Sequence, residues 1–114
     1  MAQVIPVRQC DAKTLRLVIR TVTMEFLDLT PFSSAVLTLY SDPFDPASII
    51  GNWSTDDPSR AFFRDRKNGQ VEFYFVASDT ADLGSGVQYP MRAKLYKDFE
   101  HAYTVYEGVL EVRA

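Results

Sequence analysis

Polar and apolar residues alternate along most of this chain, and the alternation predicts β-strands. The clearest example spans residues 67–96, where two runs place every second side chain on an apolar side. Successive side chains of a strand point to opposite faces of its sheet, so each run predicts a strand with one buried face. The apolar positions of the two runs are Val71, Phe73, Phe75, Tyr89, Met91, Ala93 and Leu95. We expect these residues to form the centre of one core.

The same pattern predicts six strands along the chain and a provisional seventh. The six cover residues 14–21, 35–40, 60–65, 70–76, 89–96 and 103–113, and the seventh covers residues 48–53. The seventh, anchored by Trp53, divides a proline- and aspartate-rich stretch, because an unstructured loop of about twenty residues is uncommon in a compact domain. Arg16 and Arg20 are expected on the solvent face of the first strand, where they also blunt unwanted pairing at a sheet edge.

Two local signals predict the shape of the strands and their turns. Asn68-Gly69 is the pair favoured in two-residue hairpin turns, in which both positions need positive φ, so we expect a hairpin there. Gly108 lies within the long last strand, where a glycine typically marks a bulge.

The remaining connections are of two kinds. Residues 78–84 predict a single helical turn that crosses between sheets, begun by a Ser78 or Asp79 cap and ended by Gly84. Residues 1–10 predict an arm or an edge strand, because Pro6 has no N–H to donate to a central ladder.

Together these elements predict an all-β fold. Short strands at these turn spacings are typical of an immunoglobulin-like two-sheet antiparallel sandwich, here with about seven strands and one short helical turn. A small barrel is the main rival. The chain of 114 residues has the size of a single domain, residues 1–114, and lacks the Cys–Trp–Cys pattern of antibody domains.

Composition excludes several classes of function. A net charge of −3 with no basic block disfavours nucleic-acid binding, which needs a concentrated basic face. No signal peptide or apolar run of membrane-spanning length is present, so we expect no membrane association and synthesis inside a cell. The lone Cys10 excludes an internal disulfide.

No group of residues in the sequence predicts catalysis or a cofactor. His101, the single histidine, lies in an acidic turn with no partner motif and is interpreted as a solvated hairpin residue. The aspartates at positions 42, 45, 56 and 57 could ligate calcium but lack EF-hand spacing, so ordinary turn formation is the favoured interpretation. Gly84-Ser85-Gly86 lacks the lysine and helix of a phosphate loop. We therefore predict a protein that is not an enzyme and needs neither metal nor cofactor.

Aromatic residues outside the predicted core are the main functional signal. With the basic residues of one strand they define a candidate interface: Trp53, Tyr74, Arg92, Lys94, Tyr96 and Tyr103. Phe44 and Phe99 are further aromatic candidates in loops. Aromatics on an open β surface can bind a partner protein, cover another layer of the same domain, or stack on sugars, and all three readings stay open.

Read together, several short motifs resemble a known family. They are the strand at 14–19, Leu27-Asp28-Leu29-Thr30, Ala35-Val36-Leu37, the run at 67–73, Gly86-Val87-Gln88-Tyr89 and the ending at 106–112. This outline is similar to the immunoglobulin-like amino-terminal domain of tailed-phage upper baseplate proteins and related head- or tail-appendage proteins.

The resemblance implies a virion structural protein of the tail, baseplate or capsid decoration, made in the host cytoplasm. It implies contacts with other virion proteins, and a homo-oligomer or symmetric multi-copy assembly. It brings no catalytic residues. Family members continue into a stalk or helical extension that carries the receptor-binding element, so this chain, if it is complete at Ala114, is expected to be an assembly, joining or decoration protein. A carbohydrate-binding or adhesion module that uses Trp53 and the exposed tyrosines is the alternative.

Overall fold

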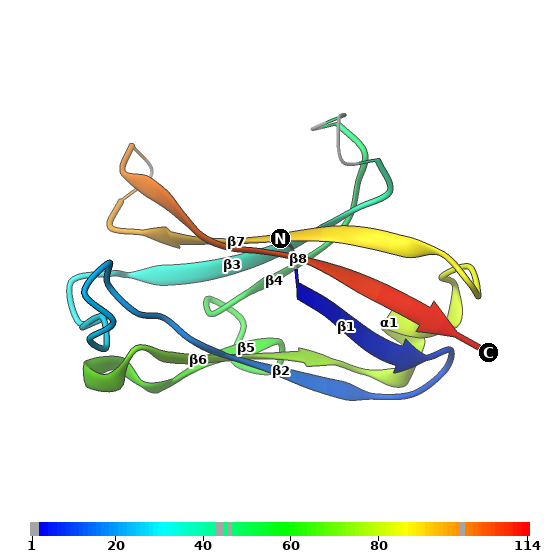
Figure 1. Cartoon of the computed structure of the whole chain (residues 1–114), viewed down its shortest axis with the longest axis horizontal. Helices are drawn as coiled ribbons and strands as arrows, with labels where there is room; N and C mark the ends of the chain where they lie inside the picture. The colour runs from blue at the N-terminus through cyan, green and yellow to red at the C-terminus, as the bar shows by residue number, and fades with distance from the viewer. Residues whose placement is uncertain (1–2, 43–44, 46, 99) are drawn as a thin grey trace.

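The chain folds into two β-sheets packed face to face (Figure 1). The computed structural model describes residues 3–42, 45, 47–98 and 100–114. The larger sheet has five strands in the order β1-β8-β7-β3-β4, and the smaller has three in the order β2-β6-β5. The bounds are β1 Gln3–Arg8, β2 Lys13–Val18, β3 Ser34–Tyr40, β4 Ile49–Ser54, β5 Ala61–Asp65, β6 Gln70–Phe75, β7 Gln88–Tyr96 and β8 Ala102–Arg113. The predicted all-β sandwich is confirmed.

The strand order is that of an immunoglobulin-type sandwich. In such sandwiches strands B, E and D belong to one sheet and strands C, F and G to the other, and variable-type domains add a strand C′ to the second sheet. Here β2, β6 and β5 correspond to B, E and D, and β3, β7 and β8 correspond to C, F and G. The additional strand is β4, which pairs with β3. The provisional strand at 48–53 is confirmed as β4, which is an edge of its sheet.

One strand pair departs from the antiparallel arrangement. Residues 1–10 were predicted to be an arm or an edge strand, and β1 is an edge strand that pairs in parallel with β8. Ile5 and Val7 point into the core. Pro6 lies on β1, the outermost strand of the sheet, opposite Glu111 of β8. An edge strand tolerates proline because one of its sides needs no donors.

The core fills the space between the sheets with side chains from both. Six of the seven residues that the period-two pattern placed at the centre of the core are buried, and the seventh, Tyr89, packs at its margin. Leu29 and Phe32 add to the core from the connection between β2 and β3. Cys10 is free and exposed in the turn after β1.

The hairpin at Asn68-Gly69 is real, but its turn differs from the prediction. β5 and β6 pair antiparallel, and a 3₁₀ helix, η1 (Arg66–Asn68), joins them. Only Gly69 has positive φ, at 70°. The Asp65 carboxylate accepts hydrogen bonds from the backbone and side-chain N–H groups of Asn68 at 3.3 and 2.7 Å, which stabilises the helical turn over a two-residue turn.

The predicted helical turn is confirmed as α1 (Ala77–Ala81), which carries the chain from β6 to β7 and so from one sheet to the other (Figure 1). The Asp79 carboxylate reaches back to accept a hydrogen bond from the Val76 backbone N–H at 2.8 Å. Ser78 lies inside the helix, and Asp82 rather than Gly84 ends it. The Gly84 N–H instead donates to the Tyr89 hydroxyl at 2.7 Å.

The bulge predicted at Gly108 lies earlier in β8. Ala93 pairs with Tyr106 and the next residue of β7 pairs with Thr104, so Val105 is the extra residue. Gly108 pairs regularly with Met91. A side chain at Gly108 would overlap the Tyr106 hydroxyl, so this glycine makes room for the tyrosine instead of marking the bulge.

Candidate interaction surfaces

Trp53, predicted as an interface residue, lies in the core. It is 3% exposed, and its ring centroid lies 4.6 Å from that of Phe75 on the opposite sheet. The guanidinium of Arg60 lies 5.5 Å from the indole centroid. β4 is an edge strand, but Trp53 occupies its inward-facing position, so the indole is unavailable to a partner or a sugar.

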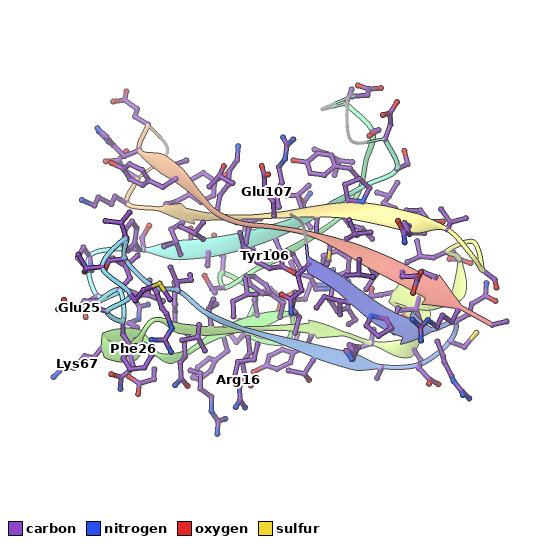
Figure 2. The ribbon with its side chains drawn as sticks, viewed as in Figure 1. Arg16, Glu25, Phe26, Lys67, Tyr106 and Glu107 are labelled. Atoms are coloured by element: carbon purple, nitrogen blue, oxygen red, sulfur yellow. The ribbon has the colours of Figure 1, made fainter. Side chains whose placement is uncertain are left out.

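The other predicted interface residues do not form a single surface. β6 and β7 belong to different sheets, so Tyr74 lies on the outer face of the three-stranded sheet, whereas Arg92, Lys94 and Tyr96 lie on that of the five-stranded sheet. Figure 2 makes the separation visible: Arg16 beside β6 and the Arg92 partner Glu107 point in opposite directions, away from the space between the sheets.

Tyr103 lies on a side of β8 that the sequence pattern did not predict. The bulge at Val105 reverses the alternation, so Tyr103 pairs with the buried Leu95 on the inner side of the sheet. It is 46% exposed, and its ring meets Phe32 edge to face at 6.2 Å. The residue therefore combines intramolecular cover with exposure at one end of the sandwich.

The outer face of the five-stranded sheet carries an exposed ion pair beside an aromatic ring. Arg92 Nε lies 3.4 Å from Glu107 Oε1, and the Arg92 guanidinium lies 5.6 Å from the Tyr40 ring centroid. Lys94 and Tyr96 follow Arg92 along β7, and both are half-buried. Tyr96 also lines an open hollow with Val36, Asp56 and Asp98, among others.

The outer face of the three-stranded sheet holds an enclosed carboxylate. Glu72 points away from the core, yet its side chain is only 6% exposed, because its neighbours cover it. Arg16 donates two hydrogen bonds to Oε2 at 2.9 and 2.8 Å, Arg64 lies 3.8 Å from Oε1, and the Tyr74 hydroxyl donates to Oε1 at 3.3 Å. Neighbouring strands supply the two arginines, one from each side of β6.

The charges of this cluster shift the pKa values of its members. The hydrogen bond from Arg16 holds the pKa of Glu72 below its ordinary value of 4.5, although burial acts in the opposite direction. Burial raises the pKa of Tyr74 above 10.0, and the negative charge of Glu72 adds to that rise. At neutral pH the cluster is therefore two guanidiniums around one carboxylate, with a neutral phenol.

Several exposed apolar residues were not predicted from the sequence. Phe62 is 50% exposed and lies directly across from Glu72, because β5 presents it outward and buries Ala61. The connection after β2 exposes Val22 completely and Met24 by 68% at the tip of a tight turn. The adjacent Phe26 ring lies 4.4 Å below the Arg20 guanidinium. Two adjacent phenylalanines at 62 and 63 gave no signal as to which one faces out.

The polar groups considered for chemistry are occupied by local structure. His101 Nδ1 lies 2.9 Å from the Asp98 carboxylate in the β7–β8 turn, and both side chains are more than half exposed. The His101 contact, with backbone N–H groups of the turn, lowers the pKa of Asp98. Asp57 accepts hydrogen bonds from the Ser59 hydroxyl and backbone, which lower its pKa, as expected of a turn residue. Phe44 and Phe99 lie outside the described residues.

Within the described part of the chain, no three acidic, histidine or cysteine side chains gather to hold a metal ion. Over the same residues, no helix has the length and apolar character needed to cross a membrane. A scan against models of protein families finds no match for this sequence, and a search of curated proteins also finds none.

Proposed function

We propose that this chain is a non-enzymatic structural protein of a tailed-phage virion, acting in the tail or baseplate or as a capsid decoration. It would bind other virion proteins, and copies of itself, at symmetric positions of a multi-copy assembly. The motif resemblance described above supports the phage setting. The sandwich supports the mode of action, because its outer faces and loops carry exposed apolar side chains that do not contribute to the core.

The observation that carries the proposal is the distribution of exposed apolar side chains. Val18, Phe26 and Phe62 are between 42% and 50% exposed on or beside the three-stranded sheet. Val4 and Ile49, 47% exposed each, lie on the two edge strands of the five-stranded sheet. Burial of apolar surface is the main favourable term in most protein–protein association. Surfaces on opposite sides of one domain allow it to join two different neighbours, as heterologous assembly requires.

The alternative role, a carbohydrate-binding module, loses its main residue. A sugar platform needs an exposed aromatic face, and the indole assigned to it, Trp53, is packed against Phe75. The remaining exposed aromatics are distributed over different faces. Protein contact is therefore the function that this geometry supports better.

Detection in purified particles tests the proposal. Particles of the phage whose genome carries this sequence are purified, and the chain is quantified by mass spectrometry against the major capsid protein. Antibody against the domain, followed by negative-stain imaging, then locates it. We expect a fixed copy number and labelling at symmetric positions. A chain that is abundant in infected cells and absent from intact particles overturns the proposal.

A further inference from the structure

The outer side of the three-stranded sheet combines three arginines with three aromatic rings. We name it the arginine–aromatic face and define it by Arg16, Arg20, Phe26, Phe62, Arg64 and Tyr74. Arg16 and Arg20 fall on one side of the β2 alternation, since Leu15, Leu17 and Ile19 are all buried. Arg64 is the bulged residue of β5 and remains outside the ladder. The face is therefore built from all three strands and from the bridge that extends β2.

The face carries a surplus of positive charge in an acidic protein. Its three guanidiniums are balanced by a single carboxylate, Glu72, which contacts Arg16 and Arg64, whereas the whole chain has a net charge of −3. Arg16 donates two hydrogen bonds to Glu72, and its side chain is still 53% exposed. Arg64, 56% exposed, touches Glu72 only at 3.8 Å. Both retain donors that a second carboxylate can accept from in fork geometry.

The face is also held in shape before any partner arrives. Glu72 fixes Arg16 through two short hydrogen bonds, and Phe26 packs under the Arg20 guanidinium at 4.4 Å. Phe62 lies beside Glu72 in the strand register and is half exposed. Preorganised arginines and aromatics lose little side-chain entropy on binding, which is why these residue types dominate the energetically important positions of interfaces.

The chemistry of the face selects among possible occupants. Two copies packed face to face would place arginines against arginines, which is unfavourable. Nucleic acid binding depends on neutralising many phosphates, and a surplus of two positive charges over the whole face is too small for it. We propose that the arginine–aromatic face docks an acidic segment of a partner protein, in which carboxylates alternate with apolar side chains. This inference rests on the proposed assembly function and names the partner chemistry.

A peptide titration of the isolated full chain tests the proposal. The probe is a blocked peptide with the sequence Glu-Phe-Glu-Leu-Glu-Phe-Glu, added to ¹⁵N-labelled protein at low salt and followed by NMR. We expect saturable shifts confined to β2, β5 and β6, weakened by added salt because the contact is electrostatic. The matched control peptide replaces every glutamate with lysine and should leave these signals unchanged.

Two variants assign the binding to the face. Arg64→Glu should weaken the acidic peptide at least about tenfold, because it replaces an attractive charge with a repulsive one. Arg92→Glu, the same change on the opposite sheet, should leave the affinity unchanged. The native spectrum of each variant shows that it is folded.

Several results would overturn the inference. They are shifts confined to the five-stranded sheet, no saturable shift at millimolar peptide, equal binding of the lysine peptide, or equal weakening by both variants. Tighter binding of an oligothymidine, or concentration-dependent shifts of the face without peptide, would point to nucleic acid or a second copy and also overturn it. If the chain is present in particles but its arginine–aromatic face does not bind the peptide, this inference alone is refuted. If the chain binds the peptide but is absent from particles, the assembly function is refuted.

Discussion

Removing the guanidinium that covers Glu72 should destabilise the protein more than removing Glu72 itself. The substitution Arg16→Met keeps the apolar stem of the side chain and deletes two hydrogen bonds, of 2.9 and 2.8 Å, to the carboxylate. Glu72, 6% exposed, then remains enclosed with its charge poorly compensated. The reverse substitution, Glu72→Met, leaves Arg16 free to face water, because its side chain is 53% exposed. The two halves of one ion pair should therefore cost different amounts.

The magnitude lies between two known limits. An exposed ion pair contributes roughly 0.2–1 kcal/mol, whereas breaking a fully buried pair costs about 3–5 kcal/mol. One partner here is enclosed and the other half exposed, and Arg64 and Tyr74 keep partial contact with the carboxylate. We expect Arg16→Met to lower the free energy of unfolding by about 1.5–3 kcal/mol, the range for hydrogen bonds to charged groups. Glu72→Met should cost less than about 1 kcal/mol, the limit for an exposed pair.

Urea unfolding of the two single variants and the double variant measures these values and their coupling. The control cycle uses Arg92→Met and Glu107→Met, an ion pair of 3.4 Å in which both side chains are exposed. Coupling between Arg16 and Glu72 should be about 1–2 kcal/mol, and in the control cycle below about 1 kcal/mol.

The same coupling should depend on pH in a defined direction. The pKa of Glu72 is lowered in the folded protein, so the stabilisation is fully present above its ordinary value of 4.5 and is lost as pH falls through the folded value. The reasoning is refuted if the two single variants cost the same, if both cycles give equal coupling, or if the Arg16–Glu72 coupling survives full protonation in acid.

Three further substitutions test individual packing statements, each by urea unfolding. Trp53→Ala should lower the free energy of unfolding by about 3–5 kcal/mol, as expected for a large buried aromatic, and a loss under about 1 kcal/mol would indicate that the indole lies at the surface. Gly108→Ala should cost about 1–3 kcal/mol by overpacking, and the cost should fall in a Tyr106→Leu background; an equal cost in both backgrounds would refute the contact. Gly69→Ala should cost at least about 1–2 kcal/mol because φ is 70° and the added methyl meets a backbone carbonyl, and a neutral result would contradict this turn geometry.

The strands and the core were predictable because their signal is local and repeated. Leu15 and Leu17, like Leu37 and Leu39, obey a period of two over several residues, and all four are buried. The pairing of strands into sheets is not local. The apolar runs of β6 and β7 read alike, and only the predicted helical turn between them, confirmed as α1, indicates that they lie in opposite sheets. The candidate interface nevertheless combined outward residues of both strands, which the structure places on two opposite faces.

The predictions of turns and bulges were wrong where a third residue decides the geometry. Asn68-Gly69 forms part of a 3₁₀-helical turn and not a two-residue turn, because the Asp65 side chain caps the helix. Tyr103 changed sides because a one-residue bulge at Val105 reverses the alternation, and β-branched valine gives no sign of that role in a sequence. The enclosure of Glu72 likewise depends on arginines from two other strands, which only the strand register brings together.

Cross-linking mass spectrometry on intact particles tests the assembly function most directly. Lys94 lies on the outer face of the five-stranded sheet, and Lys67 lies in η1 at one end of the three-stranded sheet (Figure 2). An amine-reactive cross-linker should join both lysines to other virion proteins or to other copies of this chain, because the proposed role has the domain contacting neighbours on both sides. Particles that contain the chain and yield links only within single copies, or particles that lack it altogether, would contradict the assembly function.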